Sequence, residues 1–212
     1  MDARIKVAVR CRPLVSNEPR SVTISKDAVN VGDKRFQFEH VFNETANQQD
    51  IYDSCLASMV EGCFQGYNAT ILAYGQTGSG KTHSIMGAHT DIMADMEPDE
   101  EAGIIPRALQ QVFHYLHVHQ PHHVANVRVS MIEIYNDECK DLLHPEISPR
   151  DIMLREDKHG RIFFTGAREE VIQSVREGLS CLAQGNLNRS TAETLMNQAS
   201  SRSHVSAATG FG

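Results

Sequence analysis

The sequence contains no apolar stretch long enough to cross a lipid bilayer. Its first residues, Met1-Asp2-Ala3-Arg4-Ile5-Lys6, lack the apolar core of a secretory signal peptide and lead directly into a strand-like segment. No C-x-x-C pair occurs, and the five cysteines are an odd number, which argues against a disulfide framework. These absences predict an intracellular protein without a membrane span.

Basic residues are fewer than acidic ones, with 20 Lys and Arg against 27 Asp and Glu, so the formal net charge is −7. This balance does not suggest a nucleic-acid binder, although an acidic protein can still carry a local basic face. Apolar residues make up 41% of the chain and charged residues 22%, as in globular proteins. A length of 212 residues suits one large domain or a fragment of a bigger one.

Histidine is abundant, and a cluster of five invites a metal-site interpretation: His114, His117, His119, His122 and His123. No cysteine lies near them to complete a zinc site. A solvated helix end is therefore the favoured interpretation of this cluster.

Hydrophobic periodicity predicts alternating strands and helices. Alternating apolar residues indicate strands at residues 5–10, 36–42, 127–135 and 161–164. Helical spacing indicates helices at residues 48–63, after Pro106, from Val175 to a stop at Gly185, and at residues 188–196. The segment from His89 to Gly103 contains six acidic residues and no Lys or Arg, which indicates an exposed loop. This order predicts an α/β fold.

The most informative motif is a phosphate loop that follows a predicted strand, Ala69–Tyr74. It fits G-x-x-x-x-G-K-[ST] with the residues Gly75, Gln76, Thr77, Gly78, Ser79, Gly80, Lys81 and Thr82. Glycines let the backbone amides of such a loop point at an anion. We expect Lys81 to reach the β- and γ-phosphates and the Thr82 hydroxyl to bind Mg²⁺. The alternative is a Gly/Ser-rich surface loop.

Two further segments narrow the class of nucleotide-binding protein. One is Arg10-Cys11-Arg12-Pro13, and the other is Asn197-Gln198-Ala199-Ser200-Ser201-Arg202-Ser203-His204. Hydroxyl groups in the second segment can bind Mg²⁺ or a γ-phosphate oxygen, and an arginine can brace the loop through a carboxylate. Such a loop can act as a switch that the γ-phosphate orders. The alternative is a serine-rich helix cap.

With these segments in place, the chain resembles a kinesin motor domain over nearly its whole length. The matching stretches are I-K-V-A-V-R-C-R-P at residues 5–13, F-x-F-x-x-V-F at 36–42, G-Y-N-A-T-I-L-A-Y-G-Q-T-G-S-G-K-T-H at 66–83, G-I-I-P-R at 103–107, E-I-Y-N-D at 133–137, D-L-L at 141–143 and N-x-x-S-S-R-S-H at 197–204. Residues 151–157 and 182–186 resemble the chromokinesin-like branch of the family.

The resemblance implies a P-loop NTPase fold, with a kinesin-like mixed central sheet and helices on both faces. It also implies an ATP hydrolase that uses Mg²⁺ and moves along microtubules in the cytoplasm. By position, Arg10, Arg12, Pro13 and His83 belong to the adenine site. Ser200 and Ser201 face the γ-phosphate, with Ser201 and Thr82 at the metal. Arg202 would brace this loop through a carboxylate, and Lys81 and Asn197 would complete the catalytic set. The acidic segment at residues 89–103 would be a variable loop.

The chain also departs from the family pattern. An Asp-x-x-Gly-x-Glu second switch is absent, and the small residues Val205–Gly212 predict a poor strand. We therefore expect residues 1–212 to form a single motor domain that is incomplete at its C-terminus, with impaired hydrolysis because Arg202 lacks its carboxylate. The alternative function is a non-motile nucleotide-binding fragment or regulatory isoform. A GTPase or small-molecule kinase is disfavoured, since the chain has neither Asn-Lys-x-Asp nor an Arg-rich lid.

Overall fold

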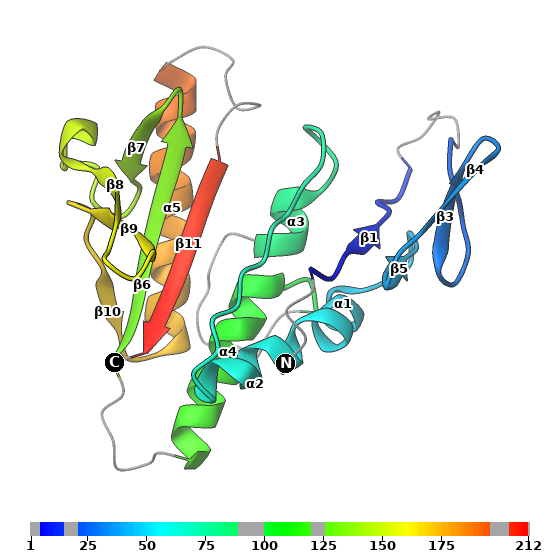
Figure 1. The fold of residues 1–212 in the computed structure, drawn as a ribbon, viewed down its shortest axis with the longest axis horizontal. Coiled ribbons are helices and arrows are strands. Elements are labelled where there is room, and N and C mark those ends of the chain that lie inside the picture. The colour runs from blue at the N-terminus through cyan, green and yellow to red at the C-terminus, as the bar shows by residue number, and fades with distance from the viewer. Residues whose placement is uncertain (1–4, 15–20, 89–99, 120–125, 196–203, 212) are drawn as a thin grey trace. The chain divides into compact units, whose positions relative to one another are not determined.

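The computed structural model describes residues 5–14, 21–88, 100–119, 126–195 and 204–211. It divides the chain into two compact units (Figure 1). The first contains Met1–His89 and Pro98–Gln111, and the second contains Thr90–Glu97 and Val112–Gly212. The single-domain organisation expected from the sequence stays a prediction.

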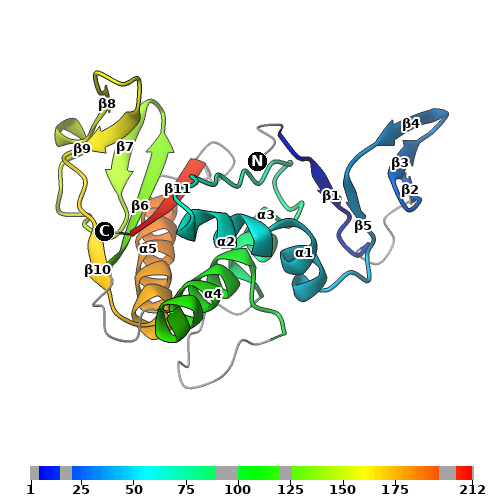
Figure 2. The same cartoon turned by 60° about the horizontal axis from the view of Figure 1, so that its bottom comes forward.

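The first unit contains two small sheets. Strand β1 (Ala8–Arg10) runs parallel to β5 (His40–Phe42), and Cys11 N–H extends the ladder to Phe42 C=O at 2.9 Å. Strands β2 (Thr23–Ile24), β3 (Ala28–Val31) and β4 (Lys34–Gln37) form an antiparallel sheet, visible as a separate hairpin-like layer in Figure 2. The prediction of one strand over residues 36–42 was therefore wrong. Phe38 N–H still donates to Asp27 C=O beside β3, whereas His40 pairs with Ala8 of β1, so the chain passes from one sheet to the other between β4 and β5.

Helix α1 (Gln48–Cys55) begins at a capping box. The Asn47 side chain accepts from Asp50 N–H at 2.7 Å, and the Asp50 carboxylate accepts from Asn47 N–H at 3.2 Å. Helix α2 (Ala57–Phe64) follows after a break at Leu56, whose φ of −122° is not helical. The predicted single helix over residues 48–63 is thus two helices, because Leu56 leaves the helical backbone and buries its side chain.

Helix α3 (Lys81–Met86) ends at Gly87, where a second backbone segment runs alongside it. Gly103 N–H donates to Met86 C=O at 3.2 Å, and Ala88 N–H donates to Glu101 C=O at 3.3 Å. A Cβ on Gly103 would lie 2.6 Å from Gly87 N, so only glycine fits at this approach. Helix α4 (Ile104–His119) starts directly afterwards, and Pro106 lies in its first turn as predicted.

The second unit is built on β6 (Val127–Tyr135), which confirms the predicted long strand. It pairs with β7 (Glu138–Asp141) through a turn at Asn136 and Asp137, whose φ values of 51° and 64° are those of a tight hairpin. β10 (Glu170–Ile172) pairs with the other half of β6. β11 (His204–Phe211) pairs antiparallel with β6 along all its residues. The prediction of a poor strand after Val205 was therefore wrong, because pairing with β6 overrides weak local propensity.

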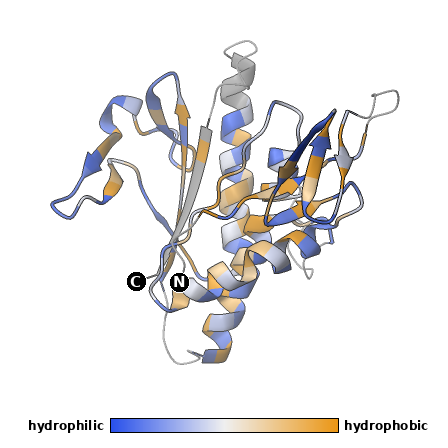
Figure 3. Cartoon of the chain, turned by 45° about the vertical axis from the view of Figure 1, so that its right-hand side comes forward, coloured by the Kyte–Doolittle hydropathy of each residue, from blue (hydrophilic) through white to orange (hydrophobic). Residues whose placement is uncertain are grey.

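Helix α5 (Val175–Leu195) packs on β6 and runs through Gly185 without stopping. The prediction of two helices separated at Gly185 was wrong. A Cβ at Gly185 would lie 2.3 Å from Met131 Sδ, so the glycine permits close packing of helix on strand. A short 3₁₀ turn, η1 (Pro149–Asp151), precedes the hairpin of β8 (Met153–Glu156) and β9 (Ile162–Thr165). In Figure 3 hydrophobic and hydrophilic residues alternate along the helices.

One predicted element does not form. Ala69–Tyr74, the expected strand before the phosphate loop, has no regular secondary structure and pairs with no strand among the described residues. Leu72 is 85% exposed and Tyr74 is 96% exposed. The apolar, β-type composition of this segment favours a strand, but a strand also needs a neighbour to satisfy its backbone, and none of the described strands supplies one.

Candidate functional site

The phosphate-loop sequence folds as a glycine-rich turn that leads into α3. Gly78 and Gly80 have φ values of 77° and 93°, a left-handed backbone that residues with a Cβ rarely adopt. Between them, Ser79 N–H donates to Gln76 C=O at 3.2 Å. Gly80 is the N-cap of α3, so Lys81 is its first helical residue. The backbone thus requires glycine at both positions, as the motif predicts.

Ser79 is the residue of this turn that points most clearly to a ligand. Its hydroxyl is buried and has no hydrogen-bond partner among the described residues. Gly75 lies against it so closely that a Cβ there would be 2.4 Å from Ser79 Oγ. A buried polar atom without a partner costs free energy, and an oxygen-rich ligand in the turn would remove that cost.

Lys81 and Thr82 follow the turn. Lys81 Nζ donates to Gly75 C=O at 2.8 Å and to Gln76 C=O at 2.9 Å, which holds the ammonium against the loop. Thr82 is exposed. An ammonium, exposed hydroxyls and backbone amides are the groups that bind phosphate oxygens and Mg²⁺. The residues present therefore fit a magnesium-bound polyphosphate.

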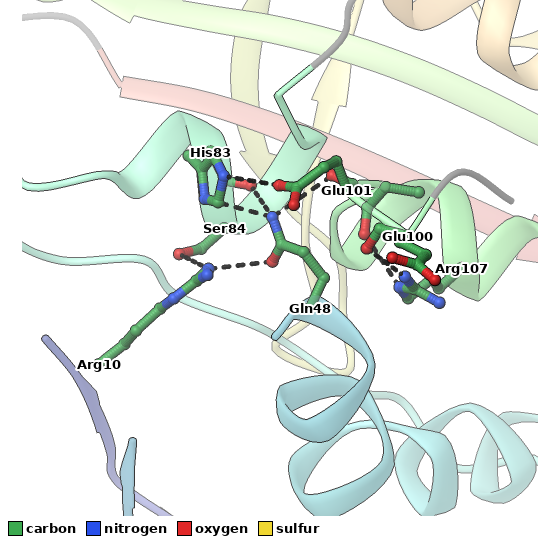
Figure 4. Close-up of polar contacts among 8 residues, drawn as sticks. Arg10, Gln48, His83, Ser84, Glu100, Glu101 and Arg107 are labelled. Atoms are coloured by element: carbon green, nitrogen blue, oxygen red, sulfur yellow. Dashed lines mark hydrogen bonds and ion pairs between the residues drawn. The ribbon is translucent and has the colours of Figure 1, made fainter. Parts of the chain in front are cut away.

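Arg10 approaches α3 from the end of β1. Its Nη1 donates to Gln48 Oε1 and to Ser84 Oγ, both at 2.9 Å. Burial lowers the pKa of the Arg10 guanidinium, and the nearby Glu101 carboxylate raises it in part. Because a partly buried charge needs hydrogen-bond partners, these two acceptors fix the side chain in place (Figure 4).

His83 lies in the same cluster, one turn into α3. Its Nε2 is 3.4 Å from Glu101 Oε2, and its Nδ1 is 3.2 Å from Gln48 Nε2. The His83 side chain is 41% exposed, so the ring stays partly open to solvent. Gln48 thus touches both Arg10 and His83, which the sequence separates widely.

Arg107 holds the segment that carries Glu101. It is 7% exposed, and its guanidinium donates to Ala102 C=O and Glu100 C=O, each at 2.9 Å. It also contacts the side chain of Gln49 on α1. These bonds tie residues 100–102 to the start of α1, which places the Glu101 carboxylate beside His83.

The structure therefore brings Arg10 and His83, two of the residues expected at the site, into one hydrogen-bonded cluster, and it places Lys81 at the start of the same helix α3. Arg12 Nη1 donates to Pro13 C=O at 3.1 Å, so the end of the Arg10–Pro13 segment is also described. Four expected catalytic or metal residues lie outside the described residues: Asn197, Ser200, Ser201 and Arg202. The sequence did not indicate Gln48 and Glu101 as residues of the site. The capping box at Asn47 and Asp50 marks a helix start, but nothing in the sequence shows what its first residue touches.

Two other sequence expectations can be compared with the described residues. His114, His117 and His119 lie on α4, while His122 and His123 fall outside the described part. Within the described ranges, no three His, Cys, Asp or Glu side chains gather as a metal site. The same ranges contain no helix both long and apolar enough to span a bilayer.

Comparison with known proteins decides the family. A family model described as the kinesin motor domain matches residues 2–208. The chain belongs to the kinesin motor-domain family. The resemblance found in the sequence is thereby confirmed, and the phosphate loop at Gly75–Thr82 lies within the matched kinesin region.

Individual kinesins are similar to this chain over most of its length. The human kinesin-like protein KIF27 is 40% identical over 209 residues, and the chromosome-associated kinesin KIF4 of Xenopus laevis is 42% identical over 210 residues. Each alignment covers 95% of this chain but only 15% and 17% of those proteins. The similar identities do not separate the chromokinesin-like branch from KIF27.

The solved structure of a fast kinesin superposes with a TM-score of 0.85 at 32% identity. It covers 98% of this chain, which spans 63% of that kinesin. This match confirms the kinesin-like α/β P-loop NTPase fold expected from the sequence.

Proposed function

We propose that this chain binds MgATP at the phosphate loop and that the whole protein is a microtubule-based motor ATPase. The fast kinesin that it resembles was described with its ATPase mechanism and its interactions with microtubules. Membership of the same family supports the same activity here. A place in the cytoplasm on microtubules follows from that activity and is part of the proposal.

The observation that carries the proposal is the geometry of Gly75–Lys81. Left-handed glycines flank a buried, unpartnered serine hydroxyl, and an ammonium closes the turn through two carbonyl bonds. A Gly/Ser-rich surface loop would not explain the buried, unpartnered hydroxyl of Ser79. A polyphosphate explains it, because phosphate oxygens accept from hydroxyl groups, and Lys81 holds its ammonium at the same turn, where it can donate to the same ligand.

We propose the residue roles from the positions that match the kinesin motifs. Lys81 binds the β- and γ-phosphates, while Arg10, Pro13 and His83 flank the base. The hydroxyls of Thr82 and Ser201 are the protein groups that would hold Mg²⁺, which when bound neutralises charge on the phosphate oxygens. Asn197, Ser200 and Arg202 complete the proposed catalytic set around the γ-phosphate.

A nucleotide-binding protein without motor turnover is the second candidate function. The exposed Ala69–Tyr74 segment favours it, because the support behind the loop lacks strand pairing in the described residues. Positioning errors of this kind reduce the rate of chemistry more than they reduce ground-state binding. The two candidates therefore differ in turnover and not in MgATP binding.

Isothermal titration calorimetry tests binding, and phosphate release with and without microtubules tests turnover. We expect the wild-type chain to bind MgATP. Lys81→Met should lower the affinity for MgATP by about ten- to a hundredfold, because it removes a charge-assisted hydrogen bond. Lys34→Met, at an exposed position of β4, is the matched control and should bind as wild type. No MgATP binding by the wild-type chain would refute the proposal, and binding without microtubule-stimulated turnover would favour the second candidate.

A further inference from the structure

We propose that Gln48 is a positioning residue that holds Arg10 and His83 in the orientation needed to flank the nucleotide base. The inference rests on the proposed function and adds a residue that the motifs do not contain. Gln48 is the first residue of α1 and is 4% exposed. An amide side chain is rarely buried so deeply unless its hydrogen bonds are satisfied.

Both ends of the Gln48 amide are used. Its Oε1 accepts from Arg10 Nη1 at 2.9 Å, and its Nε2 donates to His83 C=O at 2.8 Å. A longer contact of 3.5 Å joins Nε2 to Glu101 C=O. The amide thus links β1, α3 and the segment before α4 at one point, as Figure 4 shows.

The orientation of the amide is fixed by the chemistry of its neighbours. A guanidinium only donates, so the group facing Arg10 must be the oxygen. Carbonyl oxygens only accept, so the group facing His83 C=O and Glu101 C=O must be the NH₂. Turning the amide over would break every one of these bonds.

This orientation also selects the tautomer of His83. The Gln48 NH₂ lies 3.2 Å from His83 Nδ1, and a hydrogen on Nδ1 would point at this donor, so the geometry favours the tautomer with the ring proton on Nε2. His83 Nε2 then points its hydrogen at the Glu101 carboxylate, 3.4 Å away. Gln48 consequently sets both the position of the Arg10 guanidinium and the rotation of the His83 ring.

Gln48 makes no contact with the phosphate loop in the bonds that the structure gives it. Loss of its amide should therefore weaken the base-dependent part of the affinity and leave the polyphosphate-dependent part unchanged. A role confined to folding would weaken both parts together. The two affinities therefore distinguish a positioning role of Gln48 from a role in folding alone.

The experiment compares two ligands, MgATP and magnesium tripolyphosphate, by calorimetry. Gln48→Met keeps the length of the side chain and removes both hydrogen-bonding groups. Gln48→Glu keeps the acceptor for Arg10 and loses the donor to His83 C=O. Gln65→Met, at the exposed C-cap of α2, is the matched control. We expect Gln48→Met to lower the MgATP affinity about tenfold, the scale of one or two lost hydrogen bonds. Tripolyphosphate affinity should change less than about twofold.

Equal losses for both ligands, or no loss for either, would overturn the inference. A wild-type chain that binds neither ligand would remove the proposed function and this inference with it. If the wild-type chain binds tripolyphosphate, but the ratio of its MgATP affinity to its tripolyphosphate affinity is no higher than in the Gln48 variants, the inference alone fails.

A second readout needs no variant. Nitrogen-15 NMR of the imidazole groups in the wild-type chain should show His83 with its proton on Nε2 at neutral pH. A proton on Nδ1 would contradict the geometry of Gln48. This measurement keeps the inference testable if a substitution at Gln48 prevents folding.

Discussion

Glu133 shows how a single buried charge shapes the second unit. It lies near the C-terminal end of β6, is 3% exposed, and places Oε1 3.4 Å from Arg189 Nε on α5. The nearby Asn188 side chain donates to Leu142 C=O at 2.7 Å, so α5 is fastened to the β6–β7 hairpin at two successive residues. Because a buried carboxylate is costly unless paired, the ion pair constrains where α5 can lie on the sheet.

Removing one partner of this pair should destabilise the chain. Glu133→Gln should lower the free energy of unfolding by about 2 kcal/mol, because the guanidinium loses its counter-charge in a largely buried site. Glu133→Met combined with Arg189→Met should recover much of that loss, since apolar side chains carry no desolvation cost. Urea unfolding of Glu133→Met, Arg189→Met and the double variant measures the coupling. Strictly additive losses would show that the two charges do not interact.

At the scale of elements, two glycines look alike in the sequence but constrain the fold differently. A Cβ on Gly103 would meet the backbone of α3, with Gly87 N and Met86 C both at 2.6 Å. A Cβ on Gly185 would meet the Met131 side chain, whose Sδ can move by rotation. Backbone has no such freedom, so the two positions should tolerate alanine to different degrees.

We expect Gly103→Ala to destabilise the first unit by about 1–3 kcal/mol, as overpacking does. Gly185→Ala should cost less, because alanine improves an interior helix position by about 1 kcal/mol, which offsets part of the steric cost. Thermal melts of the two variants under identical conditions provide the comparison. A larger loss for Gly185→Ala would mean that Met131 cannot move aside.

The β8–β9 hairpin depends on one carboxylate at its turn. Asp157 accepts from Arg161 N–H at 3.0 Å, from the Arg161 guanidinium at 2.7 Å and from His159 N–H at 2.8 Å. These bonds, led by the one from Arg161 N–H, hold the pKa of Asp157 below its ordinary value. A carboxyl group with a lowered folded-state pKa stabilises the fold above its unfolded pKa and loses that contribution as pH falls through the folded value.

Asp157→Asn should therefore lower the melting temperature at neutral pH. The difference from wild type should shrink as pH falls below about 4, where the unfolded aspartate becomes protonated. Asp33→Asn, exposed in the turn between β3 and β4, is the matched control and should melt close to wild type at neutral pH. A difference for Asp157→Asn that persists unchanged at acid pH would contradict a role for its charge.

Elements whose bounds depend on local sequence patterns could be predicted from the sequence, whereas elements whose bounds depend on contacts with residues far away in the chain could not. Pro106 and the alternation in Val127–Tyr135 marked α4 and β6 correctly. Gly185 failed as a stop signal because its role is close packing against Met131, far away in the sequence. The residues of β11 failed as a strand signal because β6 supplies the pairing that their own composition does not favour.

At the scale of the whole molecule, the same difference between local and distant interactions explains which parts of the candidate site could be predicted. The phosphate loop is one continuous segment whose glycines and lysine serve local geometry, so the motif predicted it. The cluster around Gln48 joins three separate segments, and no spacing in the sequence reveals that meeting. Family resemblance supplied the positions of Arg10 and His83, but it did not supply the amide that holds them.

The exposed segment Ala69–Tyr74 has a consequence for the behaviour of the isolated chain. Three of its apolar side chains are open to solvent, with Ile71 43%, Leu72 85% and Tyr74 96% exposed. The segment contains no charge and no proline, and its backbone has no strand partner among the described residues. Such a segment can pair with its counterpart in another molecule, which satisfies its backbone and buries its side chains.

We therefore expect the 212-residue chain to self-associate as its concentration rises, and Leu72→Lys to suppress that association. A lysine there introduces like-charge repulsion between paired copies and removes the most exposed aliphatic contact of the segment. Sedimentation velocity over a concentration series measures the effect. Leu187→Lys is the matched control, because Leu187 is 60% exposed but lies on α5, where the backbone is already paired within the helix. A wild-type chain that stays monomeric throughout the series, or a control that suppresses association equally, would show that Ala69–Tyr74 is not the associating segment.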